Sequence, residues 1–308
     1  MIRVGVLRGG KADSFESSLA SGGVVLSVLQ SEPYNSKYKP IDILVDQDGV
    51  WHVGGVSVSM DKVLHFVDVV VNMLGNDYGS DGKVSQILQQ WSIPHTGSSP
   101  MVSAIAHNLI LAKDEFSKLG LKTPQHLLFE AYLEELDGSS DAYPARKAQE
   151  VFHKMPPPWI ARPFTRGSSM GIHVCKTLPE LIRAFEVGMN ERVSVLVEEL
   201  IEGKSASVSV LNNFRGQSIY PFLCLGNFST GEKREAERLA QFIHDKMHLS
   251  HFSQSDFIIT PKKGIYVLGL RTLPELHADS DLHDHLESVG VPTHELVDHL
   301  IRLALGHR

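Results

Sequence analysis

The first hundred residues alternate short apolar runs with amphipathic segments, and this alternation restricts the possible fold more than any other feature of the chain. Residues 1–7, 41–46 and 67–74 are predicted strands, and the last of them, VDVVVNML, is apolar on both faces. Helices are predicted over residues 19–29 and within GKVSQILQQW. Strands that alternate with helices form a parallel sheet covered on both sides. We therefore predict an α/β domain over residues 1–100.

The remaining residues have a different order, in which helices lie between hairpins. A helix is predicted over residues 103–119, because Gly120 and then Pro124 follow it as a stop signal. Further on, SDFIITPKKGIYVLGL reads as a β-hairpin. This order is typical of α+β lobes with antiparallel sheets. We predict a central lobe over residues 101–190 and a C-terminal lobe over residues 191–308.

One strand of the C-terminal lobe, GIYVLGLR, carries two unusual residues. Both of its alternating sets of side chains are apolar, which predicts a buried strand. Gly269 interrupts the strand and Arg271 ends it. A half-buried arginine needs an acidic partner, because an unpaired buried charge is costly.

The composition is that of an ordinary globular protein. The chain has 308 residues and a net charge of −7, and its Lys and Arg residues are scattered, so no nucleic-acid partner is expected. No apolar run is long enough to span a bilayer, and the N-terminal residues do not have the layout of a signal peptide. Cys175 and Cys224 lie in apolar runs and are predicted to be buried free thiols. These features predict a cytoplasmic protein without membrane association.

Four segments, in this order, resemble the D-alanine–D-alanine ligases of the ATP-grasp group. They are LRGGKADSFESSLASG, VVVNMLGNDYGSDGKVSQILQQWSIPHTGSS, WIARPFTRGSSMGIHV with the following VLVEELIEGKSASVSVL, and SDFIITPKKGIYVLGLRTLPEL. The resemblance implies the ATP-grasp fold, with ATP and Mg²⁺ bound between two antiparallel sheets. It also implies ATP-dependent joining of two D-alanines for peptidoglycan precursor synthesis, and a homodimer formed through the N-terminal domain.

Several positions that function in the family keep their residue type. The resemblance implies that Glu16 holds the amino group of the first D-alanine, although an acid in a first helical turn is also favoured by the helix dipole. The loop RGSSMG has the character of a phosphate cradle or of a simple hairpin turn. The other matches are Ser168 near the transferred phosphoryl group, Ser169 as a further nucleotide-binding residue, Glu198 and Glu199 beside adenine, Asp256 as a metal ligand, and Ser280 for the second D-alanine carboxylate.

Other functional positions of the family carry different residues. Arg162 stands where the family has a lysine, which keeps the charge without the compact ammonium group. Gln254 replaces an arginine that stabilises the tetrahedral intermediate. Gly269 and Arg271 replace the remaining Mg²⁺ ligands, and one carboxylate, Asp256, does not hold Mg²⁺ firmly. Further departures are Leu109 for a phosphate-contacting lysine, Ser205 for a ribose-binding glutamate, Gly75 for a histidine and Ser80 for a glutamate.

We hypothesise that Arg271 replaces the metal and neutralises Asp256, which would otherwise be a buried carboxylate without a partner. The alternative is that Gly269 and Arg271 drifted after the site lost its use. A second cluster, HADSDLHDHLE over residues 277–287, has the residue types of a transition-metal site, or it is a solvated polar loop leading into a short helix.

Three functions are compatible with these residues. In the first, a ligase-like protein without ligase activity and without a cofactor binds a small amino acid or dipeptide through Glu16 and Ser280, or serves as a scaffold for a partner. In the second, the chain is a working D-alanine–D-alanine ligase that uses ATP and Mg²⁺. In the third, Arg162, Arg166 and Arg271 bind an anionic ligand for a different reaction. The missing cations and metal ligands favour the first.

Overall fold

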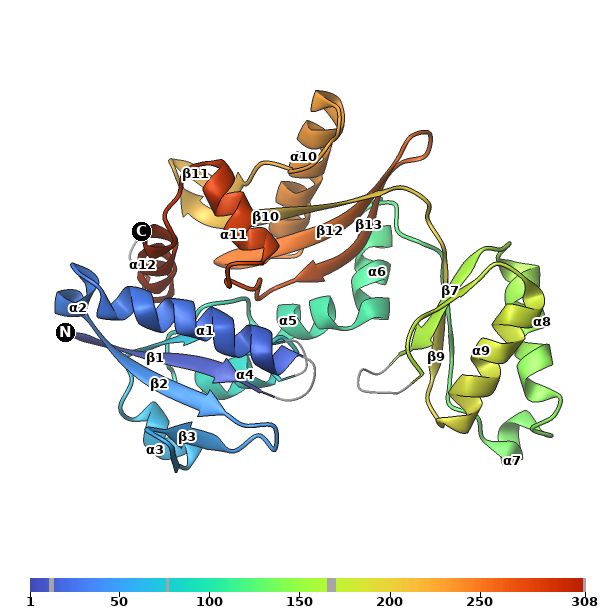
Figure 1. Cartoon of the computed structure of the whole chain (residues 1–308), viewed down its shortest axis with the longest axis horizontal. Helices are drawn as coiled ribbons and strands as arrows, with labels where there is room; N and C mark the ends of the chain where they lie inside the picture. Colours follow the sequence, from blue (N-terminus) through green and yellow to red (C-terminus); the bar gives the residue numbers. More distant parts are fainter. Residues whose placement is uncertain (11–13, 76–77, 165–169, 307–308) are drawn as a thin grey trace. The chain divides into compact units, whose positions relative to one another are not determined.

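A computed structural model describes residues 1–10, 14–75, 78–164 and 170–306 (Figure 1). The chain forms two compact units. Unit 1 contains Met1–Leu121, Ser205–Ile259 and Val267–Arg308, and unit 2 contains Lys122–Lys204 and Thr260–Tyr266. The predicted division into three domains, at residues 100 and 190, stays a prediction.

The N-terminal part of unit 1 is a five-stranded sheet with the strand order β4-β3-β2-β1-β5. Its centre is parallel, as predicted: β1 pairs in parallel with both β2 and β5. Two short antiparallel strands extend one edge. The strands are β1 (Ile2–Gly9), β2 (Tyr38–Val45), β3 (Trp51–Val53), β4 (Val56–Ser57) and β5 (Val69–Asn72), and the neighbouring helices are α1 (Phe15–Gln30), α2 (Tyr34–Lys37), α3 (Met60–Leu64) and α4 (Lys83–Gln90).

Helix α1 packs closely on β1, and a glycine permits this. A Cβ atom added to Gly22 would lie 2.5 Å from the Cβ of Arg8 on β1, which is closer than two such carbons can approach. The close contact fixes the first turn of α1 at the carboxyl end of β1. Ligands of open α/β sheets bind at this end of the strands, and Glu16 lies there, exposed, in the first turn of α1.

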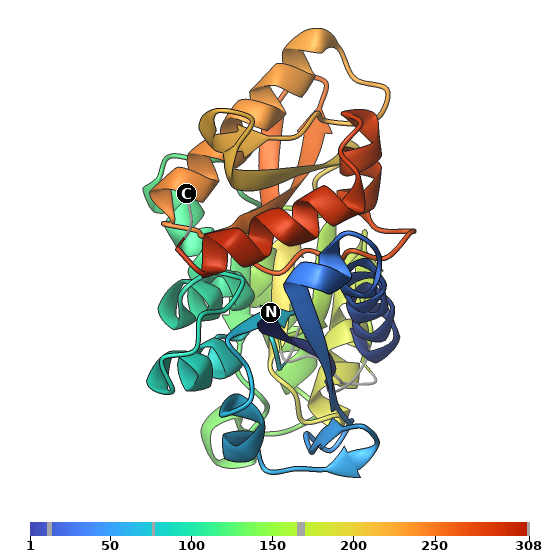
Figure 2. The ribbon, with the colours of Figure 1, turned by 90° about the vertical axis from the view of Figure 1, so that its left-hand side faces the viewer.

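The C-terminal part of unit 1 is a four-stranded sheet in the order β11-β10-β12-β13. Its elements are β10 (Lys204–Phe214), β11 (Gln217–Pro221), α10 (Thr230–Lys246), β12 (Phe252–Thr260), β13 (Gly264–Arg271), α11 (Asp281–Ser288) and α12 (Thr293–Ala304). One hydrophobic core joins this sheet to the N-terminal sheet, because Val4 and Val71 belong to the same buried cluster as Leu211 and Leu300. Figure 2 shows the red helix α12 lying between the blue N-terminal segments and the orange strands.

Unit 2 is an antiparallel sheet in the order β6-β9-β7-β8, packed against two helices. Trp159 and Phe185, from the sheet and from α9, are fully buried in its core. The antiparallel sheets and the helices of the second half confirm the predicted α+β character. The elements are β6 (His126–Phe129), α7 (Glu134–Asp137), α8 (Tyr143–Lys154), β7 (Trp159–Pro163), β8 (His173–Cys175), α9 (Leu178–Asn190) and β9 (Val195–Glu199).

The helix predicted over residues 103–119 is wrong as a single element. The structure has two helices there, α5 (Pro100–His107) and α6 (Leu109–Lys118), with Asn108 between them. The Asn108 backbone is extended, and its side-chain oxygen accepts hydrogen bonds from the amides of Ile110 and Leu111. Asparagine satisfies free amides at a helix start better than it continues a helix, so the chain breaks at this residue.

The prediction of a strand buried on both faces is also wrong for GIYVLGLR. This segment is β13, the edge strand of its sheet, and only Val267 and Leu270 are buried in it. Gly269 is half-buried and Arg271 is exposed. A strand at the edge of a sheet can carry the same apolar residues as an interior strand, so the pattern along the chain does not show where the sheet ends.

Two smaller predictions can also be compared with the structure. Cys175 and Cys224 are buried free thiols, as predicted, and burial raises the pKa of each thiol to about 11. Among the described residues, no helix combines the length and the apolar character needed to cross a membrane.

Candidate functional site

The candidate site in unit 1 is built around an ion pair between two neighbouring strands. Arg271 on β13 places Nη2 3.3 Å from Oδ2 of Asp256 on β12. The side chains are 44% and 28% exposed, respectively, so the pair lies at the surface of the sheet with the carboxylate on the inner side. The predicted contact between Arg271 and Asp256 is therefore present.

Gln254 joins Asp256 to the start of α11. Its amide nitrogen Nε2 donates to Asp256 Oδ1 at 3.1 Å and to Asp281 Oδ2 at 2.7 Å. The residue is 1% exposed, so both hydrogen bonds are shielded from water at the glutamine. An amide group has two N–H bonds, and both are used here. Gln254 consequently holds two carboxylates near each other without neutralising either.

The environment of Asp256 disfavours its charged form. Burial raises the pKa of this carboxyl above its ordinary value, and the charge of Asp281 acts in the same direction. Arg271 and the Gln254 hydrogen bond oppose the shift but do not cancel it. The Arg271 guanidinium therefore compensates the burial of Asp256 only in part, as expected for a half-exposed pair.

These residues do not fit a Mg²⁺ site. Magnesium in proteins takes oxygen ligands in octahedral geometry, usually from carboxylates and substrate phosphates. Here Asp256 has one oxygen on Gln254 and the other on Arg271, and residue 269 has no side chain to offer. The space at Gly269 is open, because a Cβ atom added there would meet no heavy atom within 4 Å. Within the described part of the chain, no group of three or more His, Cys, Asp or Glu residues is placed to hold a metal ion.

Gly75 differs from Gly269 in this respect. A Cβ atom at Gly75 would lie 2.1 Å from the hydroxyl oxygen of Ser14. At Gly75, where the resemblance implies a histidine, Ser14 therefore leaves no room for a side chain. At Gly269, where the resemblance implies a metal ligand, a side chain would meet no heavy atom within 4 Å.

Ser280 caps a helix. Its hydroxyl oxygen accepts a hydrogen bond from the amide of His283 in the first turn of α11, and the hydroxyl donates to the carbonyl of His277 at 2.7 Å. A hydroxyl has one proton. That proton is already used within the loop, so Ser280 does not offer it to a ligand in this conformation. The predicted contact between Ser280 and a ligand carboxylate stays a prediction.

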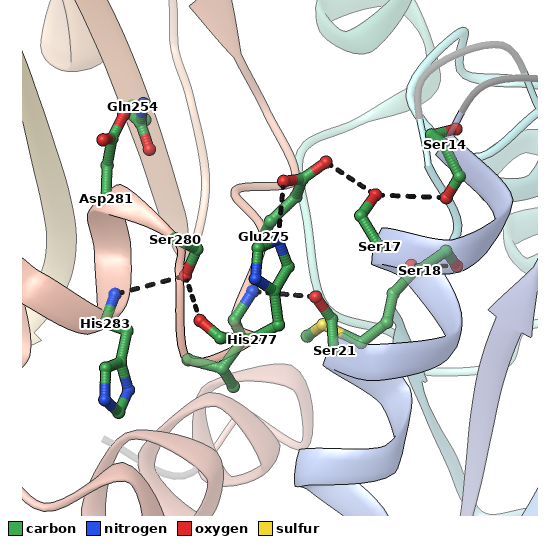
Figure 3. A network of polar contacts seen from close by, with 12 residues as sticks. Ser14, Ser17, Ser18, Ser21, Gln254, Glu275, His277, Ser280, Asp281 and His283 are labelled. Carbon is green, nitrogen blue, oxygen red and sulfur yellow. Dashed lines mark hydrogen bonds and ion pairs between the residues drawn. The ribbon is translucent and has the colours of Figure 1, made fainter.

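A polar network connects this loop to α1, and sequence reasoning missed it (Figure 3). Ser17 Oγ lies 2.9 Å from Glu275 Oε1, and His277 Nε2 lies 3.0 Å from Glu275 Oε2. A second link joins the amide of Leu276 to Ser21 Oγ at 2.9 Å. Ser17 and Glu275 are 258 residues apart in the sequence, so only the fold brings them together. The weak signal in the sequence was the polar side chain of Glu275 beside Pro274.

The histidines of the cluster over residues 277–287 have separate partners. His283 pairs with Glu287 at 3.3 Å on the surface of α11. His285 is buried and contacts the hydroxyl of Ser209 and the carbonyl of Ser207. Their side chains thus serve different contacts, with His277 bonded to Glu275.

Unit 2 carries the other predicted site residues. Arg162 on β7 places Nη2 2.6 Å from Oε2 of Glu198 on β9, whose side chain is only 6% exposed. Lys263 lies 3.9 Å from Glu199. Because the Glu198 side chain is buried, removal of Arg162 would take away the guanidinium that faces this carboxylate and would destabilise the unit. The predicted site residues Arg166, Ser168 and Ser169 lie outside the described residues.

Comparisons with known proteins agree with this architecture. Residues 117–222 match the family model described as D-ala D-ala ligase C-terminus. The D-alanine–D-alanine ligase of Geobacter sulfurreducens is 28% identical, with 97% of this chain and 93% of that protein covered. The structure is similar to the D-alanine-D-alanine ligase from Coxiella burnetii, with a TM-score of 0.83 and 20% identity, covering 99% of this chain and 96% of that one. It is also similar to the Bacillus anthracis ligase complexed with ATP, with a TM-score of 0.77 and 19% identity, covering 99% and 98%.

An N-terminal α/β sheet followed by two antiparallel sheets, with this likeness along the whole chain, defines the ATP-grasp fold. Within that fold, the chain is similar to D-alanine–D-alanine ligases over nearly its whole length, and residues 117–222 match their C-terminal family model.

Proposed function

We propose that this chain is a member of the family without ligase activity, which binds a small amino acid or a dipeptide and needs neither Mg²⁺ nor ATP to do so. The observation that carries this proposal is the ion pair between Arg271 and Asp256. It supports the view that an internal guanidinium takes the place of the metal ions implied by the family resemblance.

Electrostatics argue against a metal beside Arg271. A divalent cation a few ångströms from a guanidinium is repelled by several kcal/mol at the effective dielectric of a protein surface. Deprotonation does not relieve this repulsion, because guanidinium groups keep their proton in proteins. The oxygens of Asp256 are engaged by Arg271 and Gln254, so metal binding would also break existing contacts.

Fewer cationic side chains are also available to stabilise phosphoryl and acyl transfer than the family resemblance implies. Gln254 is neutral where the family resemblance implies an arginine, and loss of one such donor costs about 10²- to 10³-fold in rate. Arg162, which stands where the family resemblance implies a lysine, is paired with Glu198. The same pairing argues against the third function, in which Arg162 and Arg271 would be available to an anionic ligand.

The proposed ligand site retains other features of the family. Glu16 is exposed in the first turn of α1, where its carboxylate can accept an ammonium group. The loop that follows β13 is fixed to the same helix by Ser17 and Ser21. These features support binding of a small zwitterion more directly than they support catalysis.

D-alanine-dependent phosphate release from ATP in the presence of Mg²⁺ tests the proposal. We expect no release above the rate without D-alanine, and we expect D-alanyl-D-alanine alone to raise the midpoint of thermal unfolding. Robust phosphate release would overturn the proposal. No shift with D-alanine or with the dipeptide would also overturn it, because ligand binding is its positive content.

The second candidate is a working D-alanine–D-alanine ligase. It is supported by the sequence similarity to ligases, which extends over 97% of the chain. The phosphate-release measurement separates the two candidates directly.

A further inference from the structure

Four histidines lie where the two sheets of unit 1 meet, and the proposed function uses none of them. They are His95 between α4 and α5, His244 on α10, His251 just before β12, and His299 on α12, and we call them the junction histidines. His244 and His299 are buried, at 1% and 8% exposure. His95 pairs with Val70 of β5 through a parallel bridge, so its segment belongs to the N-terminal sheet.

Asn212 on β10 is hydrogen-bonded to three of the junction histidines. Its carbonyl oxygen lies 2.8 Å from Nε2 of His299, and its side-chain oxygen lies 3.1 Å from Nε2 of His244. Its amide donates to the carbonyl of His251 at 2.8 Å. Because these oxygens can only accept, both Nε2 atoms carry a proton. Asn212 therefore attaches α10, α12 and the start of β12 to one point of the C-terminal sheet.

His251 attaches the same point to the N-terminal sheet. Its backbone φ is +63°, a left-handed conformation that residues other than glycine rarely adopt. The Gly97 amide donates to Nδ1 of His251 at 3.0 Å. The amide of the neighbouring Ser250 donates to Ser98 Oγ, also at 3.0 Å. Two adjacent residues thus tie the segment after α4 to the C-terminal sheet.

A single proton changes the contact between His251 and Gly97. Nδ1 accepts from the Gly97 amide only while this nitrogen carries no proton. The Gly97 carbonyl oxygen lies 2.8 Å from the same nitrogen, and it accepts from Nδ1 only after Nδ1 has gained a proton. A proton on Nδ1 therefore breaks the contact with the amide and sets two N–H groups against each other.

Burial keeps the junction histidines neutral. It lowers the pKa of His244 to about 4 and also lowers the pKa of His95. Burial lowers the pKa of His251 as well, and charges on His95 and His299 would lower it further, whereas hydrogen bonds to two backbone carbonyls oppose this shift. A histidine whose pKa is low in a closed junction and ordinary in an open one favours opening as the pH falls below about 6.5.

The other charged groups beside the junction have partners of their own. These are Asp245 with Lys246, Asp298 with Lys37 and Arg302, and Arg215 with the ring of Phe214, which packs edge-on against His299. Asp245 raises the pKa of His244, but its side chain is 54% exposed, so water screens its charge. The closed junction therefore gives an added proton little compensation.

We infer that the junction histidines form a proton-sensitive switch within unit 1: in acid they gain protons, and the segment around Gly97 and the end of α12 then lose their contacts with the C-terminal sheet while both sheets keep their strands. The switch is a property of the fold, so this inference does not depend on the proposed function. It differs from acid unfolding, because only the attachment between the sheets opens.

Hydrogen exchange of the full chain at pH 7 and pH 5, corrected for the intrinsic exchange rate, tests the inference. Protection at the amides of Gly97 and Asn212 should fall by about 20-fold, the change in the opening equilibrium if His244 alone regains the ordinary pKa of histidine on opening. Low urea concentrations should affect this opening less than the exchange of amides at the centre of β1, because a local opening exposes less surface than unfolding does. Unchanged protection at pH 5, or the same urea dependence as β1, would overturn the inference.

The double variant His244→Gln, His251→Gln should lose most of the pH dependence at Gly97 and Asn212, because glutamine forms hydrogen bonds but takes up no proton in this range. His285→Gln is the matched control. His285 is equally buried and contacts Ser209 and Ser207 of β10, outside the junction. It should keep the full change in protection.

If the double variant does not fold at pH 7, the two single variants replace it, and each should lose part of the pH dependence. Full pH dependence in the double variant, or in both single variants, would overturn the inference. The same would follow if His285→Gln removed the pH dependence as completely as the junction variants do.

Discussion

Arg271 and Asp256 lie 3.3 Å apart on neighbouring strands, with a glycine two residues before the arginine. The guanidinium and the open space at Gly269 belong to the same strand, β13. A metal site could therefore be rebuilt on this strand by two substitutions, whereas the position of Gly75 is blocked by Ser14.

The double variant Gly269→Glu, Arg271→Asn should gain Mg²⁺ binding. It removes the repelling cation and adds a carboxylate and an amide oxygen beside Asp256, at a position where a side chain meets no heavy atom. Millimolar Mg²⁺ should raise the midpoint of its thermal unfolding, because a ligand that binds only the folded state stabilises it. The variant Gly269→Gln, Arg271→Leu is the control of similar size. If Mg²⁺ also raised the midpoint of thermal unfolding of the unchanged protein, the claim that Arg271 and Gly269 prevent Mg²⁺ binding would be wrong.

Replacing Asp256 by asparagine should cost little stability at pH 7. Burial raises the pKa of Asp256 despite Arg271, so its charged form is disfavoured in the folded state. For an acid with a raised pKa, this cost is absent at low pH and develops as the pH rises from the unfolded value through the folded one. We expect Asp256→Asn to change the free energy of unfolding by less than about 1 kcal/mol at pH 7, since the pair is half-exposed. A loss of several kcal/mol in urea unfolding would show that the ion pair is a major support.

His244 should make the protein sensitive to acid. It is 1% exposed, its ring contacts Ser253 and Asn212, and burial lowers its pKa to about 4. A histidine with a lowered pKa contributes stability above the unfolded value, near 6.5, and this contribution is lost as the pH falls toward the folded value. The free energy of unfolding should therefore drop by about 2 kcal/mol between pH 7 and pH 5 through this residue.

Urea titrations at the two pH values check this expectation. His244→Gln should flatten the pH dependence, while the exposed His153→Gln should not. A pH dependence that is the same in both variants would place the acid sensitivity elsewhere.

Asn108 should stabilise the start of α6. Its side-chain oxygen accepts two backbone amides, so Asn108→Ala should cost about 1 kcal/mol of stability. Asn108→Asp should keep most of the stability that the cap provides, because aspartate caps a helix start about as well as asparagine. Hydrogen exchange at the amides of Ile110 and Leu111 is the local measurement. Equal protection in the alanine and aspartate variants would mean that tertiary packing alone holds this helix start.

The sequence allowed the architecture and one contact of the site to be predicted. The parallel N-terminal strands follow from runs such as VDVVVNML, whose continuous apolar character is a local property. The Arg271–Asp256 pair could be anticipated because both residues lie on adjoining strands of one hairpin, where short separation limits the choice of partner.

The remaining features could not be predicted, because they depend on where sheets end and on which distant residues meet. The edge position of β13 is set by its neighbours in the sheet and not by its own residues. Glu275 meets Ser17 only after the whole chain has folded. Asn108 carries a signal for a helix break, because asparagine caps helix starts, but the apolar spacing on both sides of it is that of a continuous helix.

Helix α12 packs against β5 and α1, so the core of the N-terminal sheet contains residues that lie far along the chain. During synthesis, Val4 and Val71 emerge long before Leu296 and Leu300, which belong to the same core. The N-terminal sheet therefore cannot complete its core on the ribosome until α12 has been made. Ribosome-bound chains that lack α12 should expose apolar surface, which makes them candidates for chaperone binding.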